Sequence, residues 1–265
     1  MSDATVITTI DARGVATVTL NRPQRHNAFD DAIIEQLRQA FDELAAQETV
    51  RVVVLASTGE SFSAGADLGW MKQMAAYDYE HNLQDAWQLA GMLRALYRLP
   101  QPTIARVQGA AFGGAVGLVS CCDMAVASER ASFALSEAKI GLVPATISPY
   151  VIRAIGERAA RRYFTTAERF DAARALQLGL LSEVVAEQDL DSAVEGLVAA
   201  ILGNGPMAVR AAKELIGVVA GRELDTNLVE ETCTRIAHIR VSDEGQEGLG
   251  AFLEKRSPGW LQARG

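Results

Sequence analysis

The chain has 265 residues, 49% of them hydrophobic and 22% charged, with a formal net charge of −8, which fits one packed domain with or without a helical appendage. The acidic balance and the lack of a long basic run exclude nucleic acid as an expected partner. The longest uncharged run, residues 107–122, is shorter than the about 20 residues that a helix needs to cross a bilayer, so no membrane partner is expected either.

Three cysteines are too few for a disulfide framework, and two of them, Cys121 and Cys122, are adjacent. The three histidines show no metal-ligand spacing, so no metal site is expected. No apolar leader opens the sequence, because Asp3 and Asp11 flank a short strand-like segment. These features together predict a protein of the reducing cytoplasm.

The first half of the chain alternates between strand and helix patterns. Residues 5–10 and 15–20 predict a hairpin, and residues 29–47 carry apolar side chains at helical spacing. The continuous β-branched run at 50–55 is typical of a strand covered on both faces. A second long helix is expected over 81–99, where two prolines end it.

Further short strands are expected at 103–107, 123–127 and 132–135, and from residue 147 onward the pattern is almost wholly helical. Pro206 is expected to occupy the first position of a new helix, and a last helix is expected from about 242 to 256. The change in periodicity predicts an α/β core over residues 1–200 and a helical C-terminal region over 201–265.

Two segments contain more small residues than packing alone requires, and each directly follows a predicted buried strand. They are residues 61–67 (SFSAGAD) and 108–117 (QGAAFGGAVG), and the second also opens a helix. Small residues let a ligand approach the main chain, and the start of a helix leaves N–H groups unpaired. Two such groups facing one point would bind a developing oxyanion, although the glycines alone would equally permit tight helix–strand packing.

Competing glycine motifs do not fit. A dinucleotide-binding fingerprint ending at Gly114 and Gly117 would need a glycine at Phe112, and no phosphate-binding loop with its lysine is present. Around Ser61, Ser63 stands where a nucleophile elbow requires its second glycine. The remaining candidate for chemistry is Glu137, which follows an apolar strand. Desolvation there would raise its pKa toward the range useful for proton transfer, while a solvated carboxylate beginning a helix is an equally good reading.

Six separated blocks, in this order, resemble the crotonase (enoyl-CoA hydratase/isomerase) family and cover nearly the whole chain. They are residues 20–28, 63–67, 109–123, 137–144, 179–185 and 252–256. The resemblance implies a spiral of β-β-α units with a helical C-terminal trimerisation region, and assembly as a homotrimer or as a dimer of trimers. It also implies an acyl-CoA thioester substrate and no separate cofactor, since coenzyme A is part of the substrate.

The same resemblance implies that the N–H groups of Ala66 and Gly114 form an oxyanion hole and that Glu137 is the main catalytic carboxylate. Positions implied to bind the substrate or its CoA part come from all along the chain: Arg25, Ala28, Ala64, Gly65, Asp67, Gly113, Gly117, Tyr150 and Lys255. Asp67 has the alternative role of capping the next helix, and Lys255 would act from a neighbouring subunit.

One position departs from the family pattern. Hydratases of the family carry a first catalytic glutamate after the Gly-Gly segment, where this sequence has Gly117. A lone Glu137 suits a Δ3-Δ2-enoyl-CoA isomerase, in which one base moves a proton between C2 and C4. However, residues 113–123 and 144–150 are similar to bacterial hydratases of methylglutaconyl-CoA and isohexenylglutaconyl-CoA, which act in leucine and terpene catabolism.

We therefore predict a hydratase of a branched, 3-substituted enoyl-CoA, with 3-methylglutaconyl-CoA as the leading substrate. Arg153 or Tyr150 is the candidate to bind a distal carboxylate. The isomerase and a non-catalytic acyl-CoA-binding relative are the alternatives.

Overall fold

The computed structural model describes residues 4–261. The chain begins with a hairpin of β1 (Val6–Ile10) and β2 (Val15–Leu20), which pair antiparallel as expected. The side chain of Asp11 closes the turn by accepting hydrogen bonds from the N–H groups of Arg13 and Val15.

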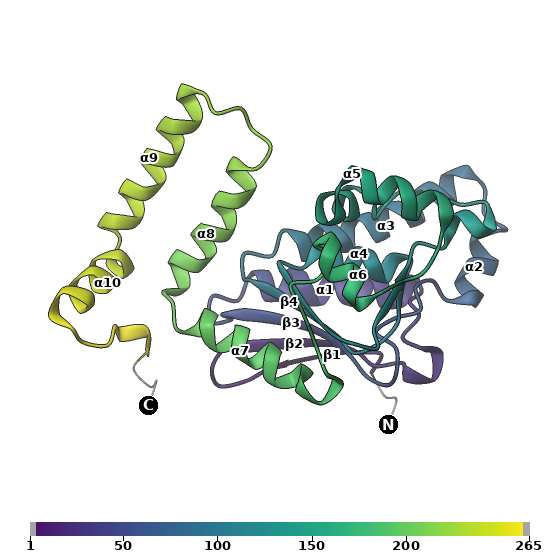
Figure 1. The fold of residues 1–265 in the computed structure, drawn as a ribbon, viewed down its shortest axis with the longest axis horizontal. Helices are drawn as coiled ribbons and strands as arrows, with labels where there is room; N and C mark the ends of the chain where they lie inside the picture. The colour runs from purple at the N-terminus through teal and green to yellow at the C-terminus, as the bar shows by residue number, and fades with distance from the viewer. Residues whose placement is uncertain (1–3, 262–265) are drawn as a thin grey trace.

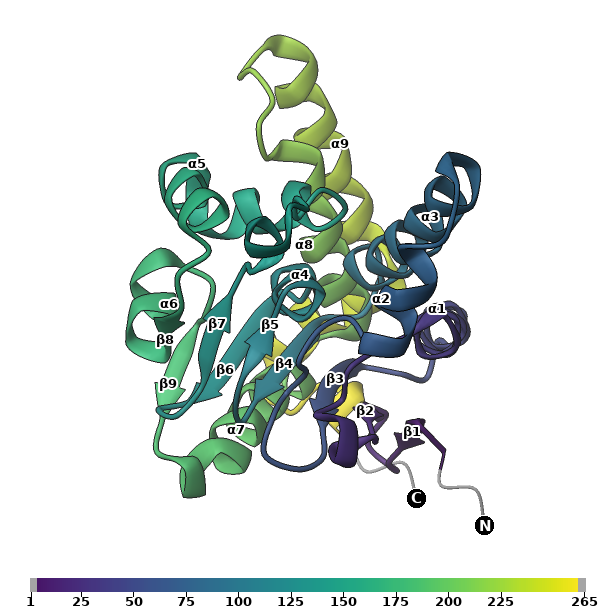
Figure 2. The same ribbon diagram turned by 90° about the vertical axis from the view of Figure 1, so that its right-hand side faces the viewer.

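A six-stranded sheet in the order β1-β2-β3-β4-β6-β9 forms the centre of the molecule (Figure 2). After the hairpin every pairing is parallel. The remaining strands are β3 (Val52–Ser57), β4 (Thr103–Val107), β6 (Met124–Ser128) and β9 (Glu183–Val185). All six residues of β3 are buried, as its β-branched run predicts, because helices cover both faces of the sheet.

The main core lies on the face covered by α1 (Asp31–Ala45), α3 (Tyr79–Tyr97) and α4 (Gly114–Cys121). The five apolar positions of α1 that the periodicity selects are all buried: Ile33, Ile34, Leu37, Phe41 and Leu44. The helix begins two residues later than expected, because Asp30 caps it by accepting the N–H of Ile33. Phe29 therefore lies outside the helix.

The opposite face of the sheet is covered by α7 (Leu190–Leu202), which packs on a smaller core. A second sheet of three short strands, β5 (Ala111–Phe112), β7 (Ser132–Ala134) and β8 (Phe170–Asp171), lies beside the start of α4. The other core helices are α2 (Leu68–Met74), α5 (Ser148–Thr166) and α6 (Ala172–Leu178), with short 3-10 turns at Pro23–Arg25, Glu137–Ile140 and Glu187–Asp189.

The expectation of almost wholly helical structure after residue 147 is wrong at β8 and β9. These strands have two and three residues, which is too few to show a period in the sequence. They form because strands already in place offer them pairing partners: β7 for β8, and β6 for β9.

The C-terminal helices form an arm that stands away from the core (Figure 1). The arm consists of α8 (Pro206–Val219), α9 (Thr226–Val241) and α10 (Asp243–Glu254), followed by a short turn at Gly259–Leu261. Pro206 and Ser242 begin their helices as predicted, whereas α10 ends at Glu254 because Lys255 takes a left-handed backbone. The division into 1–200 and 201–265 stays a prediction.

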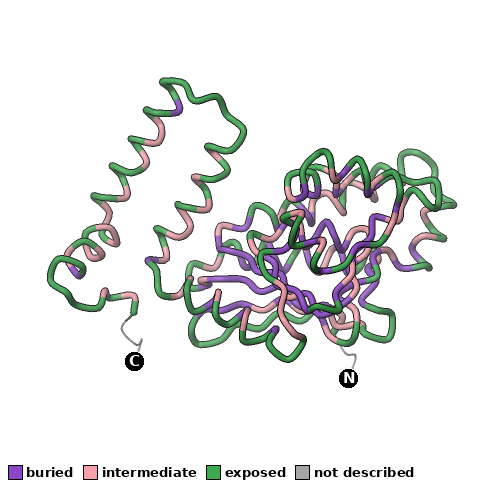
Figure 3. Tube along the Cα trace, in the orientation of Figure 1, coloured by how far each residue is buried: buried purple, intermediate pink, exposed green. Residues whose placement is uncertain are grey.

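Most of the arm is exposed, as the colouring in Figure 3 makes clear. No residue of α8 is buried, and α9 buries only Leu228. Within residues 4–261, no single helix is long and apolar enough to cross a bilayer; α7 and α8 reach that length only as a pair, bent by 104°.

Candidate active site

The two segments rich in small residues contact each other main chain to main chain. Ser63 donates its N–H to the carbonyl of Ala110 at 3.0 Å and accepts the N–H of Phe112 at 3.0 Å. Gly65 has a φ of +86°, and a Cβ atom at this position would lie 2.7 Å from the carbonyl oxygen of Phe112. The loop after β3 and the loop after β4 therefore meet with no side chain between them.

The first of these loops presents the amide of Ala66. On its two sides, Phe29 donates its N–H to the carbonyl of Gly65 at 2.9 Å and accepts the N–H of Asp67 at 3.0 Å. The N–H of Ala66 itself has no acceptor within residues 4–261. This pairing leaves one main-chain donor available beside the second loop.

The second loop presents the amide of Gly114, the first residue of α4. Gly113 donates its N–H to Ala134 at 2.8 Å and accepts the N–H of Val116, while the N–H of Gly114 has no acceptor in the described part of the chain. The dipole of α4 favours negative charge at this end of the helix. Two unpaired amides on touching loops are the arrangement that an oxyanion hole requires.

Glu137 lies directly beside the second amide. Its Oε1 atom is 3.3 Å from the position of a Cβ atom on Gly113. Its Oε2 atom is buried and has no hydrogen-bond partner among the described residues. Burial raises the pKa of Glu137, and a hydrogen bond from its own main chain only partly opposes the rise. Of the two readings left open by the sequence, the structure thus supports the desolvated carboxylate, which suits proton transfer.

The position where the family pattern has its first glutamate is closed. Gly117 is buried, and a Cβ atom there would lie 2.4 Å from Cγ2 of Ile147 and 3.5 Å from Cδ2 of Leu93. Ile147 precedes α5 and is only 2% exposed. An apolar side chain therefore fills the space at Gly117, where the family resemblance led us to expect a substrate contact.

Several residues expected to bind CoA lie near the first amide. The N–H of Ala64 donates to the carbonyl of His26 at 2.9 Å, which brings Arg25, Ala28 and Ala64 onto neighbouring loops. Arg25 and Ala64 are exposed, whereas Ala28 is buried. Asp67 caps α2 by accepting the N–H of Gly69 at 2.7 Å, which is the alternative role expected for it, and it also forms an ion pair with Arg22 at 3.4 Å.

Three expected contributors lie away from this site. Lys255 ends α10 on the arm, far from α2 and α4 within its own chain (Figure 1). Tyr150 and Arg153 line a cavity of about 210 Å³ together with Ser120 at the C-terminal end of α4, whereas Gly114 is at its N-terminal end. Their expected role toward a distal carboxylate would therefore require an acyl chain that reaches along α4.

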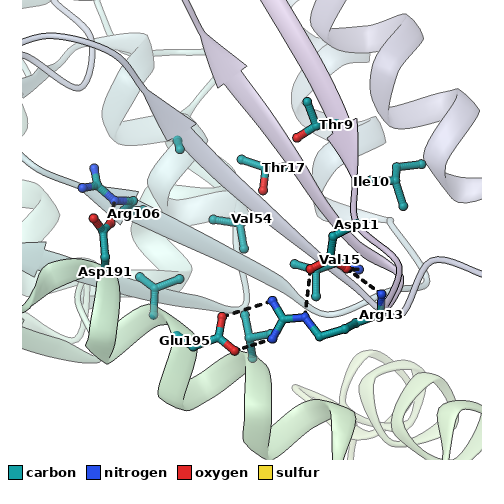
Figure 4. Close-up of a pocket in the computed structure, with 13 residues that line it drawn as sticks. Thr9, Ile10, Asp11, Arg13, Val15, Thr17, Val54, Arg106, Asp191 and Glu195 are labelled. Atoms are coloured by element: carbon teal, nitrogen blue, oxygen red, sulfur yellow. Dashed lines mark hydrogen bonds and ion pairs between the residues drawn. The ribbon is translucent and has the colours of Figure 1, made fainter. Parts of the chain in front are cut away.

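Another cavity, of about 410 Å³, is on the other face of the sheet, between the β1–β2 hairpin and α7 (Figure 4). Arg13 pairs there with Asp11 and Glu195, and Arg106 pairs with Asp191 at 2.5 Å. Both cations in this cavity are thus neutralised by carboxylates. Neither the two unpaired amides nor Glu137 lines it, so it is not the candidate active site.

Sequence reasoning missed three residues that shape the site: Asn27, Phe29 and Ile147. The capping pattern at Asp30 was the one available signal, because it places Phe29 before the helix. Across residues 4–261, no three His, Cys, Asp or Glu side chains are grouped so that they could hold a metal ion.

Comparison with known proteins agrees with this geometry. The model of the enoyl-CoA hydratase/isomerase family matches residues 11–263, and the chain belongs to that family. It is an enzyme of the enoyl-CoA hydratase class with the mixed α/β crotonase fold, as expected, and its substrates are acyl-CoA thioesters.

Solved structures support the assignment over the full length. An enoyl-CoA hydratase from Shewanella pealeana is 48% identical, with a TM-score of 0.94 over 98% of this chain and 97% of that one. A crotonase from Legionella pneumophila, described as an enoyl-CoA hydratase/isomerase, is 47% identical, with a TM-score of 0.93 over 98% and 100%. A Thermus thermophilus protein named as an enoyl-CoA hydratase is 34% identical over 92% of this chain and 96% of its own.

The raised pKa of Glu137 predicts how stability depends on pH. Because the folded pKa lies above 4.5, protonation of Glu137 favours the folded state, and this contribution is lost as the pH rises through the folded pKa. We expect E137Q to melt at a higher temperature than the wild type at pH 7, with the difference closing as the pH falls toward 4.5. Calorimetric melting curves between pH 4.5 and 8 measure this. The control variant E48Q, at an exposed loop position, should melt at the same temperature as the wild type. A difference in melting temperature between E137Q and the wild type that does not vary with pH contradicts the prediction.

The contact between Gly117 and Ile147 predicts a stability effect. G117A should lower the free energy of unfolding by about 1–3 kcal/mol through overpacking. The matched change G196A, in α7 with nothing within 4 Å of the new Cβ atom, should be neutral or stabilising. In an I147A background the penalty of G117A should disappear. Urea denaturation of the four variants tests this, and a G117A variant as stable as the wild type refutes it.

Proposed function

We propose that this enzyme hydrates a branched, 3-substituted enoyl-CoA, with 3-methylglutaconyl-CoA as the leading substrate. The observation that carries the proposal is the half-buried side chain of Glu137, whose buried Oε2 atom has no hydrogen-bond partner among the described residues. It lies beside the amides of Gly114 and Ala66, which have no acceptor in that part of the chain either. The choice of a branched substrate rests on the sequence similarity of residues 113–123 and 144–150 to hydratases of that kind.

In the proposed mechanism the thioester carbonyl oxygen accepts hydrogen bonds from Ala66 and Gly114. This withdraws electrons from the conjugated double bond and makes C3 electrophilic. Glu137 takes a proton from water as the water oxygen forms its bond to C3, and the electron pair of the double bond moves into an enolate held by the two amides. Glu137 then returns the proton to C2. The carboxylate is regenerated, and the net change is the addition of one water molecule.

A single base without a second acid is also what an isomerase needs, and the apolar closure at Gly117 favours this second candidate. Glu137 would then remove a proton at C4 and deliver it to C2 without admitting water. The two activities differ in their product: an alcohol from hydration, a conjugated enoyl-CoA from isomerisation.

Turnover of defined thioesters tests the proposal. We expect the wild type to convert 3-methylglutaconyl-CoA to an alcohol product, and E137Q to lower kcat at least about a hundredfold, the usual scale of acid–base catalysis. Because the reactive form of Glu137 is the carboxylate and its pKa is raised by burial, the wild-type rate should fall as the pH is lowered through that pKa. Mass spectrometry distinguishes the alcohol from its precursor.

Conversion of a 3-enoyl-CoA to the 2-enoyl isomer with no alcohol would establish the isomerase instead. If E137Q carried out the wild-type reaction, whether hydration or isomerisation, at the wild-type rate, Glu137 would be removed from the mechanism.

We further propose that the chain works as a homotrimer or hexamer in a reducing compartment such as the cytoplasm. The arm exposes large apolar side chains, among them Ile216, Val241, Phe252 and Leu253, at 69–81%. Large apolar side chains exposed on three neighbouring helices support protein–protein contact as the role of the arm. The proposed compartment is supported by the cysteines of the chain. All three are free thiols, the state that a reducing compartment would maintain.

Lys255 connects the proposed assembly with the proposed active site. It lies far from the site of its own chain, so it would reach a CoA phosphate only in the site of a neighbouring chain. We expect sedimentation to give a trimer or a multiple of three, and K255A to raise KM about tenfold with kcat unchanged, because a charged hydrogen bond contributes roughly 1.5–3 kcal/mol. R158A, which removes an equally exposed cation on α5, should change neither constant. A monomer with wild-type activity contradicts this assembly.

A further inference from the structure

Phe29 touches both loops of the candidate oxyanion hole, each in a different way. Its main chain is bonded on both sides of Ala66, through the carbonyl of Gly65 at 2.9 Å and the N–H of Asp67 at 3.0 Å. These two bonds fix the peptide plane between Gly65 and Ala66, and therefore the direction of the Ala66 N–H.

The ring of Phe29 supports the other donor. A Cβ atom on Gly114 would lie 2.9 Å from both Cε2 and Cζ of this ring, so the Cα atom of Gly114 rests directly on the ring. Phe29 is 1% exposed and belongs to the main core. One buried side chain thus sets how closely the start of α4 approaches the loop that carries Ala66.

The surroundings of Phe29 leave it little freedom to shift. Asn27, 1% exposed, accepts the N–H of Arg22 at 2.8 Å and donates to the carbonyls of Thr58 at 2.7 Å and Ser61 at 2.9 Å. On the other side, Asp30 caps α1. Asn27 and Asp30 thus anchor the chain on both sides of Phe29, so the position of its ring is determined by the fold.

We infer that Phe29 is a positioning residue that holds the amides of Ala66 and Gly114 at the separation needed to bind one oxygen atom. It acts through its main chain on the first donor and through its ring on the second, and it touches no reacting atom. This inference rests on the proposed oxyanion hole. A donor displaced by a fraction of an ångström still belongs to a folded protein, but it stabilises the enolate less.

The test compares F29L with F41L. Phe41 is fully buried in the same core on α1, so both variants lose a buried ring, and both should lower the melting temperature similarly. Only F29L should lower kcat, by about 10- to 100-fold, with KM changed less than about threefold. The rate is measured with whichever of 3-methylglutaconyl-, 3-methylcrotonyl- and crotonyl-CoA the wild type converts fastest.

A spectroscopic measurement separates positioning from general stability. The ligand is isovaleryl-CoA labelled with ¹³C at its thioester carbonyl, at a concentration that saturates the enzyme. Bound to the wild type or to F41L, this carbonyl should show a lower C=O stretching frequency than in the free ligand. Bound to F29L, its frequency should return most of the way to that of the free thioester. Loss of core packing alone would not change this frequency.

A double-mutant cycle tests the contact itself. G114A keeps the N–H but drives its new Cβ atom against the Phe29 ring, so it should lower kcat at least about tenfold in the wild type and in F41L. In F29L, where the ring is gone, the same change should cost less than about twofold, because the two residues are coupled.

Wild-type kcat and carbonyl frequency in F29L, or independent effects of F29L and G114A, would overturn the inference while leaving the oxyanion hole intact. A wild type that binds the labelled thioester without any shift in its carbonyl frequency would instead remove the oxyanion hole, and the role of Phe29 with it.

Discussion

The site depends on one steric constraint, the contact between two stretches of main chain after adjacent parallel strands. Gly65 meets the carbonyl of Phe112, and a Cβ atom on Gly109 would lie 1.9 Å from the carbonyl oxygen of Glu60. No other residue type fits at this distance. Because both loops follow strands that pair directly, β3 with β4, the register of the sheet sets where the amides of Ala66 and Gly114 lie.

Glu137 differs from the other acidic side chains near the site in its surroundings. Most acidic side chains around the site are compensated: Asp67 pairs with Arg22 and caps α2, and Asp30 caps α1 and also pairs with Arg22. Glu137 is half-buried against Gly113, a residue with no side chain to offer a donor, and its Oε2 atom has no hydrogen-bond partner within residues 4–261. The fold tolerates an uncompensated carboxylate here, which raises its pKa, and such local cost is typical of a reactive group.

How far the sequence predicts this molecule depends on the range of the interactions involved. The 3.6-residue spacing of α1 and the β-branched run of β3 are local signals, and both elements form as predicted. The contact of Ile147 with Gly117 joins residues thirty positions apart, and no local pattern reveals it. The two- and three-residue strands β8 and β9 depend likewise on partners that are distant in sequence. The sequence itself singled out Glu137 and the two segments rich in small residues, but the choice of Ala66 and Gly114 within those segments came from the family resemblance, which supplied the long-range information.

The closure at Gly117 also limits which chemistry the proposed site can perform. A carboxylate placed there would have to displace Ile147, and the atoms nearest to its Cβ, which belong to Ile147 and Leu93, offer no hydrogen bond in place of the water it loses. The packing therefore disfavours a second acid at this position. Proton movements in the proposed mechanism must then begin and end on Glu137. Hydration and isomerisation both satisfy this condition, since each returns the carboxylate to its starting state. What separates the two reactions is whether a water molecule can lie between Glu137 and C3 of the substrate.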